Sequence, residues 1–169
     1  DREFRQAFES AGITVIRGLE GSTEMGHILV VGLHRYVGGG MHRVTELKKL
    51  VSQHGGVMIS AHPFRNFFNR PPYNLNLVFQ SENGLPGSAR EASIHPLFSA
   101  IDEIEVANGS NTPAENLFCL EVAEELGLRG TGGSDAHSTH GLGSCVTIFD
   151  GDVRSEADLI EAIKARAIS

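Results

Sequence analysis

Residues able to bind metal ions recur along the chain. They are Glu20, His27, His62, Asp135 and His137, and three of them belong to a set of eight histidines. Imidazole nitrogen and carboxylate oxygen suit zinc, manganese or iron. In an extended Asp135-Ala136-His137 segment the first and third side chains point to the same side, so they can chelate one ion or bind neighbouring ions. The set predicts a divalent metal centre that orients a phosphate and lowers the pKa of a bound water.

Each of these residues also has an ordinary structural interpretation. Glu20 precedes Gly-Ser, which is typical of a turn, and His27 opens an apolar strand, where a hydrogen-bonded core histidine is common. His62 lies at a strand exit. Asp135 and His137 lie in a glycine-rich segment that fits an Asx turn with a surface histidine. The metal hypothesis therefore depends on the whole set and not on one residue.

Two further polar residues are candidates for binding substrate. Arg65 follows His62 closely, and a guanidinium group matches the geometry of a phosphate. A surface salt bridge is the alternative. Asn108 follows a predicted strand and either holds a site loop, contacts substrate or forms a plain turn. Cys119 lies within a predicted helix, which argues against a cysteine nucleophile.

The elements that must position these residues are short apolar strands alternating with helices. Strands are predicted over 13–19, 27–33, 57–61, 101–107, 128–132 and 145–149, and helices over 3–11, 43–54, 113–126 and 155–165. This order predicts an α/β fold with a largely parallel sheet or barrel. Sites in such folds form at the carboxyl ends of strands, where all the candidates except His27 are expected.

Residues 64–95 interrupt this alternation. The segment is rich in Asn, Pro, Gly and Ser, and loops of this length in a compact domain are usually functional. Several aromatic residues lie in or beside it, which is not typical of a solvated linker. We therefore expect a loop or lid insertion that covers part of a site.

Composition excludes several classes of protein. The 169 residues fit one domain, and the net charge of −7 argues against a general nucleic-acid binder without excluding a nucleotide substrate. No apolar stretch approaches the roughly 18–20 residues of a membrane span, and the first residues lack the apolar core of a signal peptide. Cys119 and Cys145 have no CxxC spacing and are typical of a reducing compartment, so we expect a cytoplasmic protein.

Four motifs in this order resemble the PHP family, which is named for the PHP domains of DNA polymerases and for histidinol phosphatase. They are Gly18-Leu19-Glu20, His27-Ile28-Leu29, Ala61-His62-Pro63 and, most specific, Gly133-Ser134-Asp135-Ala136-His137. Glu105-Val106-Ala107-Asn108 and residues 156–166 resemble a strand and the last helix of the family. The resemblance covers nearly the whole chain. It implies a distorted (β/α)7 TIM-like barrel with up to three divalent ions, such as zinc, manganese or iron, at the strand carboxyl ends.

The resemblance also implies roles for individual residues. Glu20 resembles a carboxylate that bridges two ions, and His27 and His62 resemble the imidazoles that complete the second ion's site. Asp135 resembles a ligand of the first ion and His137 a ligand of the third, which makes both candidate catalytic residues. The implied reaction is hydrolysis of a phosphate ester by metal-bound hydroxide. Because the chain lacks polymerase domains and a basic surface, the expected substrate is a small phosphorylated molecule, such as a nucleotide or sugar phosphate.

The chain departs from the family in one respect. The family begins with a His-x-His motif on its first strand, and this sequence contains no His-x-His. We therefore expect residues 1–169 to be one PHP domain truncated at its N-terminus by roughly 60 residues, or about two βα units. A fragment is the favoured explanation; a short form completed by another chain and a degenerate member are the others. An open barrel exposes strand edges and apolar surface, which predicts a homo-oligomer.

Two other functions are also compatible with the sequence. The absent His-x-His supports a non-catalytic metal-binding or regulatory module. Amidohydrolases also use metal centres in barrels, so metal-dependent hydrolysis of a C–N bond is the third hypothesis.

Overall fold

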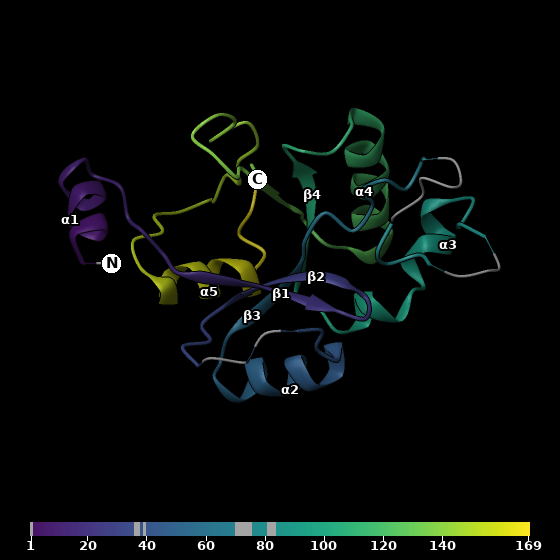
Figure 1. The fold of residues 1–169 in the computed structure, drawn as a ribbon, viewed down its shortest axis with the longest axis horizontal. Coiled ribbons are helices and arrows are strands. Elements are labelled where there is room, and N and C mark those ends of the chain that lie inside the picture. Colours follow the sequence, from purple (N-terminus) through teal and green to yellow (C-terminus); the bar gives the residue numbers. More distant parts are fainter. Residues whose placement is uncertain (1, 36–37, 39, 70–75, 81–83) are drawn as a thin grey trace.

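The strands form one open, mixed sheet (Figure 1). The computed structural model describes residues 2–35, 38, 40–69, 76–80 and 84–169. In sheet order the strands are β1 (Gly18–Thr23), β2 (Gly26–Val31), β3 (Val57–Ser60), β4 (Glu103–Asn108) and β5 (Thr131–Gly133). The pairs β1–β2 and β2–β3 are antiparallel, whereas β3–β4 and β4–β5 are parallel. The predicted α/β class is confirmed, the expectation of a largely parallel sheet is wrong for β1 to β3, and the described strands do not close into a barrel.

Helices cover both faces of this sheet. They are α1 (Arg2–Ser10), α2 (Val44–Gln53), α3 (Ala89–Ser93), the 3-10 turn η1 (Pro96–Ser99), α4 (Pro113–Leu126) and α5 (Glu156–Lys164). Helix α2 lies on one face of β1 to β3 and α5 on the other (Figure 1). No helix of the described residues is long and apolar enough to cross a membrane.

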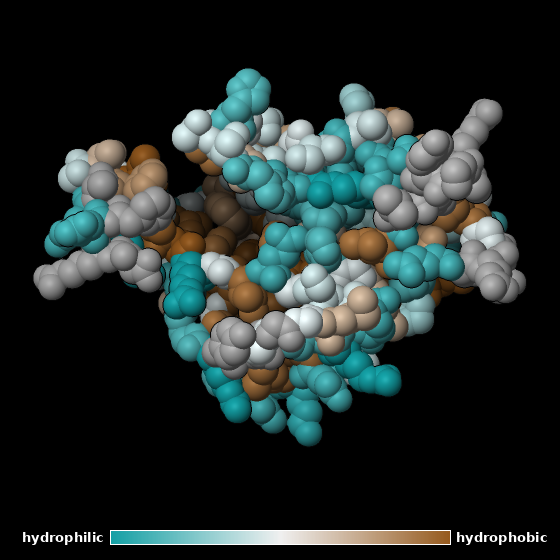
Figure 2. All heavy atoms as spheres, in the orientation of Figure 1, coloured by the Kyte–Doolittle hydropathy of each residue, from teal (hydrophilic) through white to brown (hydrophobic). Residues whose placement is uncertain are grey.

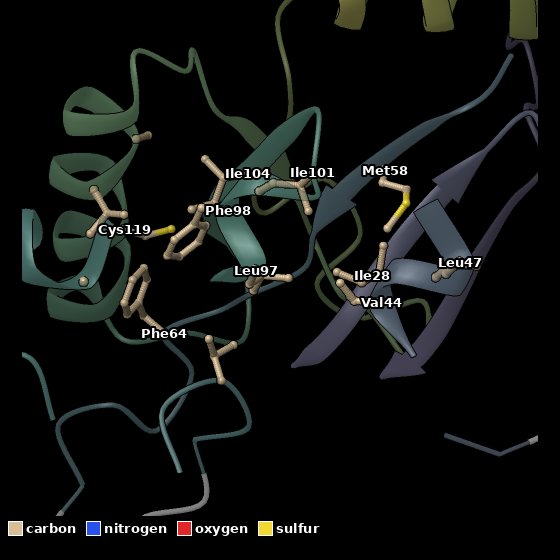
Figure 3. Packing of buried hydrophobic residues seen from close by; sticks show 14 of the residues in the cluster. Ile28, Val44, Leu47, Met58, Phe64, Leu97, Phe98, Ile101, Ile104 and Cys119 are labelled. Atoms are coloured by element: carbon tan, nitrogen blue, oxygen red, sulfur yellow. The ribbon is translucent and has the colours of Figure 1, made fainter. Parts of the chain in front are cut away.

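Strand β3 shows why both faces must be covered. Its side chains alternate, as in any strand. Met58 packs in the larger core cluster with Ile28 and Val44, whereas Val57 and Ile59 pack with Ile163 of α5. Figure 3 shows the larger cluster continuing from the α2 side to α4, where Cys119 lies near Phe98 and Ile104. All four residues of β3 are buried and three of them are apolar, which is typical of a strand covered on both faces.

Local signals fix the ends of the two best-predicted helices. Thr112 and Glu115 form a reciprocal capping box at the start of α4, Pro113 is the first helical residue, and Gly127 ends the helix at φ +65°. Ser155 caps α5 by accepting a hydrogen bond from the Asp158 backbone N–H. The predicted helices over 3–11 and 43–54 are confirmed to within two residues.

Two strand predictions are wrong. The strand predicted over 13–19 is shifted to Gly18–Thr23, so Glu20 lies within β1 and not at its end, because pairing with β2 sets the register. Residues 145–149 form no strand. The Thr147 side chain, instead of a backbone ladder, bonds both the N–H and the carbonyl of Gly132, and only Phe149 makes a bridge, to Ile168.

The segment 64–95 is anchored in the core where it is described. Phe64 and Phe67 are buried, and they contact the rings of Phe79 and Phe118. Residues 70–75 and 81–83, including Tyr73, lie outside the described residues, and the lid stays a prediction.

Helix α1 lies apart from the sheet (Figure 1). Figure 2 shows apolar side chains in the hollow between this helix and the rest of the face in view. Exposed large apolar side chains of the chain include Ile13, Val146 and Ile148. The homo-oligomer stays a prediction.

Candidate metal centre

Three of the predicted ligands converge at one edge of the sheet. Ligand atoms of Glu20, His27 and His62 all lie within 4.8 Å of one another. Glu20 comes from β1, His27 is the second residue of β2, and His62 comes from the segment directly after β3. The Ala61 N–H donates to the His27 carbonyl at 3.0 Å, which extends the β2–β3 pairing up to the site.

The carboxylate of Glu20 lies between the two imidazoles. Its Oε1 is 2.9 Å from His27 Nδ1 and 3.5 Å from His62 Nε2. The two rings pack edge-on with centroids 5.1 Å apart. Hydrogen bonding to His62 and the nearby His27 ring lower the pKa of Glu20, against the opposing effect of burial. Glu20 is thus held ionised, which is the form that binds a cation.

The donor set fits a divalent metal ion. His27 Nδ1 is buried and makes no hydrogen bond, although Glu20 Oε1 is only 2.9 Å away, so the two atoms are close but misaligned for N–H···O bonding. A buried polar atom without a partner is costly, and an ion shared with Glu20 and His62 would satisfy it. Two imidazoles and one carboxylate are ligands used by zinc, manganese and iron.

A buried carboxylate supports this site from behind. Glu105 of β4 is 4% exposed, and its Oε2 accepts hydrogen bonds from the His62 backbone N–H and the Asn108 amide, both at 2.9 Å. Burial raises the pKa of Glu105, and the bond from Asn108 partly offsets this. His62 adopts φ +32°, a strained backbone conformation for a residue with a Cβ. The hydrogen bond from the His62 N–H to Glu105 therefore stabilises this strained backbone conformation of His62.

Arg65, Asn108 and Asp135 form a second group beside the first. Arg65 Nη2 donates to Asn108 Oδ1 at 2.8 Å and forms an ion pair with Asp135, and its Nε donates to Asn111 Oδ1 at 3.3 Å. The guanidinium therefore joins the loop after β3 to the ends of β4 and β5. Glu105 links the two groups, because it bonds both His62 and Asn108.

The structure does not bring Asp135 and His137 into the Glu20–His27–His62 cluster. Asp135 adopts φ +50° and directs its carboxylate to Arg65. His137 has an 89% exposed side chain, and its Nδ1 lies 3.0 Å from the Asp135 carbonyl oxygen. Among the described residues, Glu20, His27 and His62 form the only group of three such ligands.

Sequence reasoning missed the role of Glu105. It entered only as part of a strand motif, although an acidic residue flanked by Ile104 and Val106 is a signal for a buried, partnered carboxylate. Its partners, His62 and Asn108, are not visible from the sequence.

The C-terminal third of the chain is similar in sequence to a known protein family. Residues 113–168 match the sequence model of the PHP-associated family. The resemblance to the PHP family is thereby confirmed. The PHP-associated segment runs from α4 through β5 and α5, so it contains Asp135 and His137, whereas Glu20, His27 and His62 precede it.

One solved structure is similar over a larger part of the chain. It is a "putative metal-dependent phosphoesterase" from Bifidobacterium adolescentis, with 22% sequence identity and a TM-score of 0.47. The match covers 79% of this chain and 40% of that chain. The chain thus spans about two fifths of the length of that protein. No curated protein sequence matches the chain.

Proposed function

We propose that this chain is part of a metal-dependent hydrolase that cleaves phosphate esters of a small phosphorylated substrate. The observation that carries the proposal is the convergence of the ligand atoms of Glu20, His27 and His62 to within 4.8 Å of one another. The PHP-associated match supports the same class of protein. A divalent ion, when bound, would supply positive charge against the phosphate and lower the pKa of a coordinated water.

We assign separate roles in this reaction to individual residues of the chain. Glu20, His27 and His62 would hold the ion, and Glu105 fixes the His62 backbone. Arg65 is the candidate phosphate-binding residue. Its Nε and Nη2 are engaged by neighbouring acceptors, whereas Nη1 makes no hydrogen bond to any described residue. Asn108 orients this guanidinium and is the second candidate for contacting substrate.

The roles proposed for Asp135 and His137 require rearrangement. As a metal ligand or catalytic group, Asp135 would have to exchange its ion pair with Arg65 for the ion, and His137 would have to turn in from solvent. We propose that these changes accompany metal loading in the whole protein, where up to three ions and a complete distorted (β/α)7 barrel are expected. A cytoplasmic location is part of the same proposal, and both cysteines are free thiols.

Metal binding is the first test. Titration calorimetry with Zn²⁺ or Mn²⁺ should give one tight site in the wild-type chain, and Glu20→Gln and His62→Ala should weaken it by at least tenfold. His34→Ala is the matched control, because His34 is exposed and pairs with Glu156 away from the cluster. Equal binding by the control and cluster variants would refute the metal centre.

Turnover of a generic aryl phosphate is the second test. The longest available form of the protein, loaded with Mn²⁺ or Zn²⁺, should hydrolyse it, and Asp135→Ala should abolish turnover. No turnover, together with no effect of Asp135→Ala, would refute the phosphoesterase proposal. One bound ion without turnover would support the second candidate, a non-catalytic metal-binding module, which the Arg65–Asp135 ion pair and the exposed His137 favour.

A further inference from the structure

A recess adjoins the candidate metal centre on one side. Its volume is about 120 Å³, and it lies between the beginning of β2, the loop after β3 and residues 77–78. His27 and His62 line it, whereas Glu20 does not. The recess is thus beside the Glu20–His27–His62 cluster and not the ion position itself.

The outer wall of the recess is apolar. It consists of Leu77 and Val78, with Pro63 on the loop side. Val78 is 8% exposed and belongs to the core cluster, so its position is fixed by packing. A Cβ on Gly26 would stand 3.0 Å from Val78 Cγ2, and the glycine there permits this close approach of β2 to the wall.

Asn76 sets the distance between the two sides of the recess. Its Nδ2 donates to the carbonyls of Pro63 at 2.8 Å and Arg65 at 2.9 Å. Its Oδ1 accepts from the backbone N–H groups of Val78 at 3.1 Å and Phe79 at 2.8 Å. One buried amide therefore clamps the loop after His62 to the apolar wall, and the recess is preformed.

The recess has both polar and apolar lining residues. His27, His62, Arg65 and Asn66 are its polar lining residues, and Pro63, Leu77 and Val78 line it with apolar groups. Hydroxyl groups against Leu77 and Val78 would lose hydrogen bonds to water without gaining partners. An apolar cavity of about 150 Å³ holds one benzene molecule, so this slightly smaller and partly open recess matches a single flat ring.

We propose that this recess is the specificity pocket for the group attached to the phosphate, and that it selects monoesters of a single apolar ring over polyol phosphates. This inference rests on the proposed phosphoesterase function. It assigns Val78 and Leu77 as specificity residues and Asn76 as the residue that positions them.

Binding of two phosphonates, which are not hydrolysed, tests the pocket without requiring turnover. With the Zn²⁺-loaded protein, calorimetry should give a Kd for phenylphosphonate at least tenfold lower than for methylphosphonate. Val78→Thr keeps the side-chain shape but replaces one methyl group with a hydroxyl. It should reduce the ratio of the methylphosphonate Kd to the phenylphosphonate Kd to about threefold or less, while the Kd for methylphosphonate is unchanged. Leu77→Asn, at a position that is 41% exposed, should reduce the ratio in the same direction.

The outcomes separate this inference from the function on which it rests. Equal affinities for the two phosphonates in the wild type, or an unchanged ratio in both variants, would overturn the specificity pocket alone. Failure of the Zn²⁺-loaded protein to bind either phosphonate would overturn both the pocket and the proposed phosphoesterase. A high ratio in the wild type that falls in both variants, with methylphosphonate binding intact, supports the pocket.

Discussion

Replacing Asn76 with alanine should destabilise the protein far more than one surface-loop substitution normally does. Asn76 is 4% exposed, and its side chain makes four hydrogen bonds to backbone groups of residues 63–65 and 78–79. Each such bond contributes about 0.5–1.5 kcal/mol net, so four give about 2–6 kcal/mol. Water entering the vacated space would satisfy some of the backbone groups. We therefore expect Asn76→Ala to lower the free energy of unfolding by about 3 kcal/mol.

Urea denaturation followed by circular dichroism measures this change directly, with the unfolding slope compared between variants. Asn69→Ala is the matched control. The Asn69 side chain is exposed and donates one hydrogen bond, to Asn66 Oδ1 at 3.1 Å, so its loss should cost less than about 0.5 kcal/mol. Asn76→Asp keeps both acceptor bonds but places a carboxylate against two carbonyl oxygens, and it should be at least as destabilising as Asn76→Ala.

A change of less than about 1 kcal/mol in the free energy of unfolding of Asn76→Ala would refute this prediction, because the four hydrogen bonds of Asn76 would then contribute too little to hold the two segments together. The prediction also fails if Asn76→Asp is as stable as the wild type at neutral pH. Either result would mean that the loop after His62 is held by its own packing, through Phe64 and Phe67, and not by the amide.

The remaining predictions concern helix capping, a half-buried histidine and the two thiols. Thr112→Ala removes half of the capping box and should lower the free energy of unfolding by about 1 kcal/mol in urea titration; no change would contradict the capping role. Burial lowers the pKa of His95, so the folded state binds fewer protons than the unfolded state, and its contribution to stability is present above the ordinary pKa and lost as pH falls through the lowered value. His95→Gln should therefore flatten the loss of stability on mild acidification, and an unaltered pH profile would refute this. Burial raises the pKa of the Cys119 thiol well above its usual value, so iodoacetamide should modify Cys145 first and Cys119 only on unfolding, as read by peptide mass spectrometry.

Helices were predictable because their signals are local. The start of α4 is specified by Thr112, Pro113 and Glu115 within four consecutive residues, and its end by Gly127. The start of α5 depends in the same way on Ser155 and the backbone three residues later. No distant part of the chain has to be known for these boundaries.

Strand boundaries were less predictable because pairing decides them. Residues 13–17 have the composition of a strand, yet β1 begins only at Gly18, where Val31 of β2 becomes its partner. The 145–149 segment also has strand composition, but the Thr147 hydroxyl forms hydrogen bonds with the backbone N–H and carbonyl of Gly132, in place of a backbone ladder. In both places the deciding interaction is distant in sequence, and composition carries no trace of it.

The candidate site was predictable in part. Residue type and motif order singled out the three ligands that converge, but also His137, which the structure leaves in solvent. Glu105 and Asn76 were missed because their importance lies in burial and in the backbone groups that they bond. A buried polar residue of this kind becomes recognisable only when the surrounding elements are placed.

His27 shows how topology resolves a contradiction in the sequence. It begins a strand, whereas the other ligands follow or lie near strand ends, and in a parallel sheet it would sit at the opposite edge. At about 3.3 Å per residue, β2 is about 17 Å long, which is far beyond the reach of a shared ion. Because β2 is antiparallel to both β1 and β3, its first residues instead pair with Ser22 and extend to Ala61, beside Glu20 and His62. The reversal of one strand is therefore what makes a three-residue metal centre possible within this chain, and the two-residue turn between Thr23 and Gly26 is the feature that imposes it.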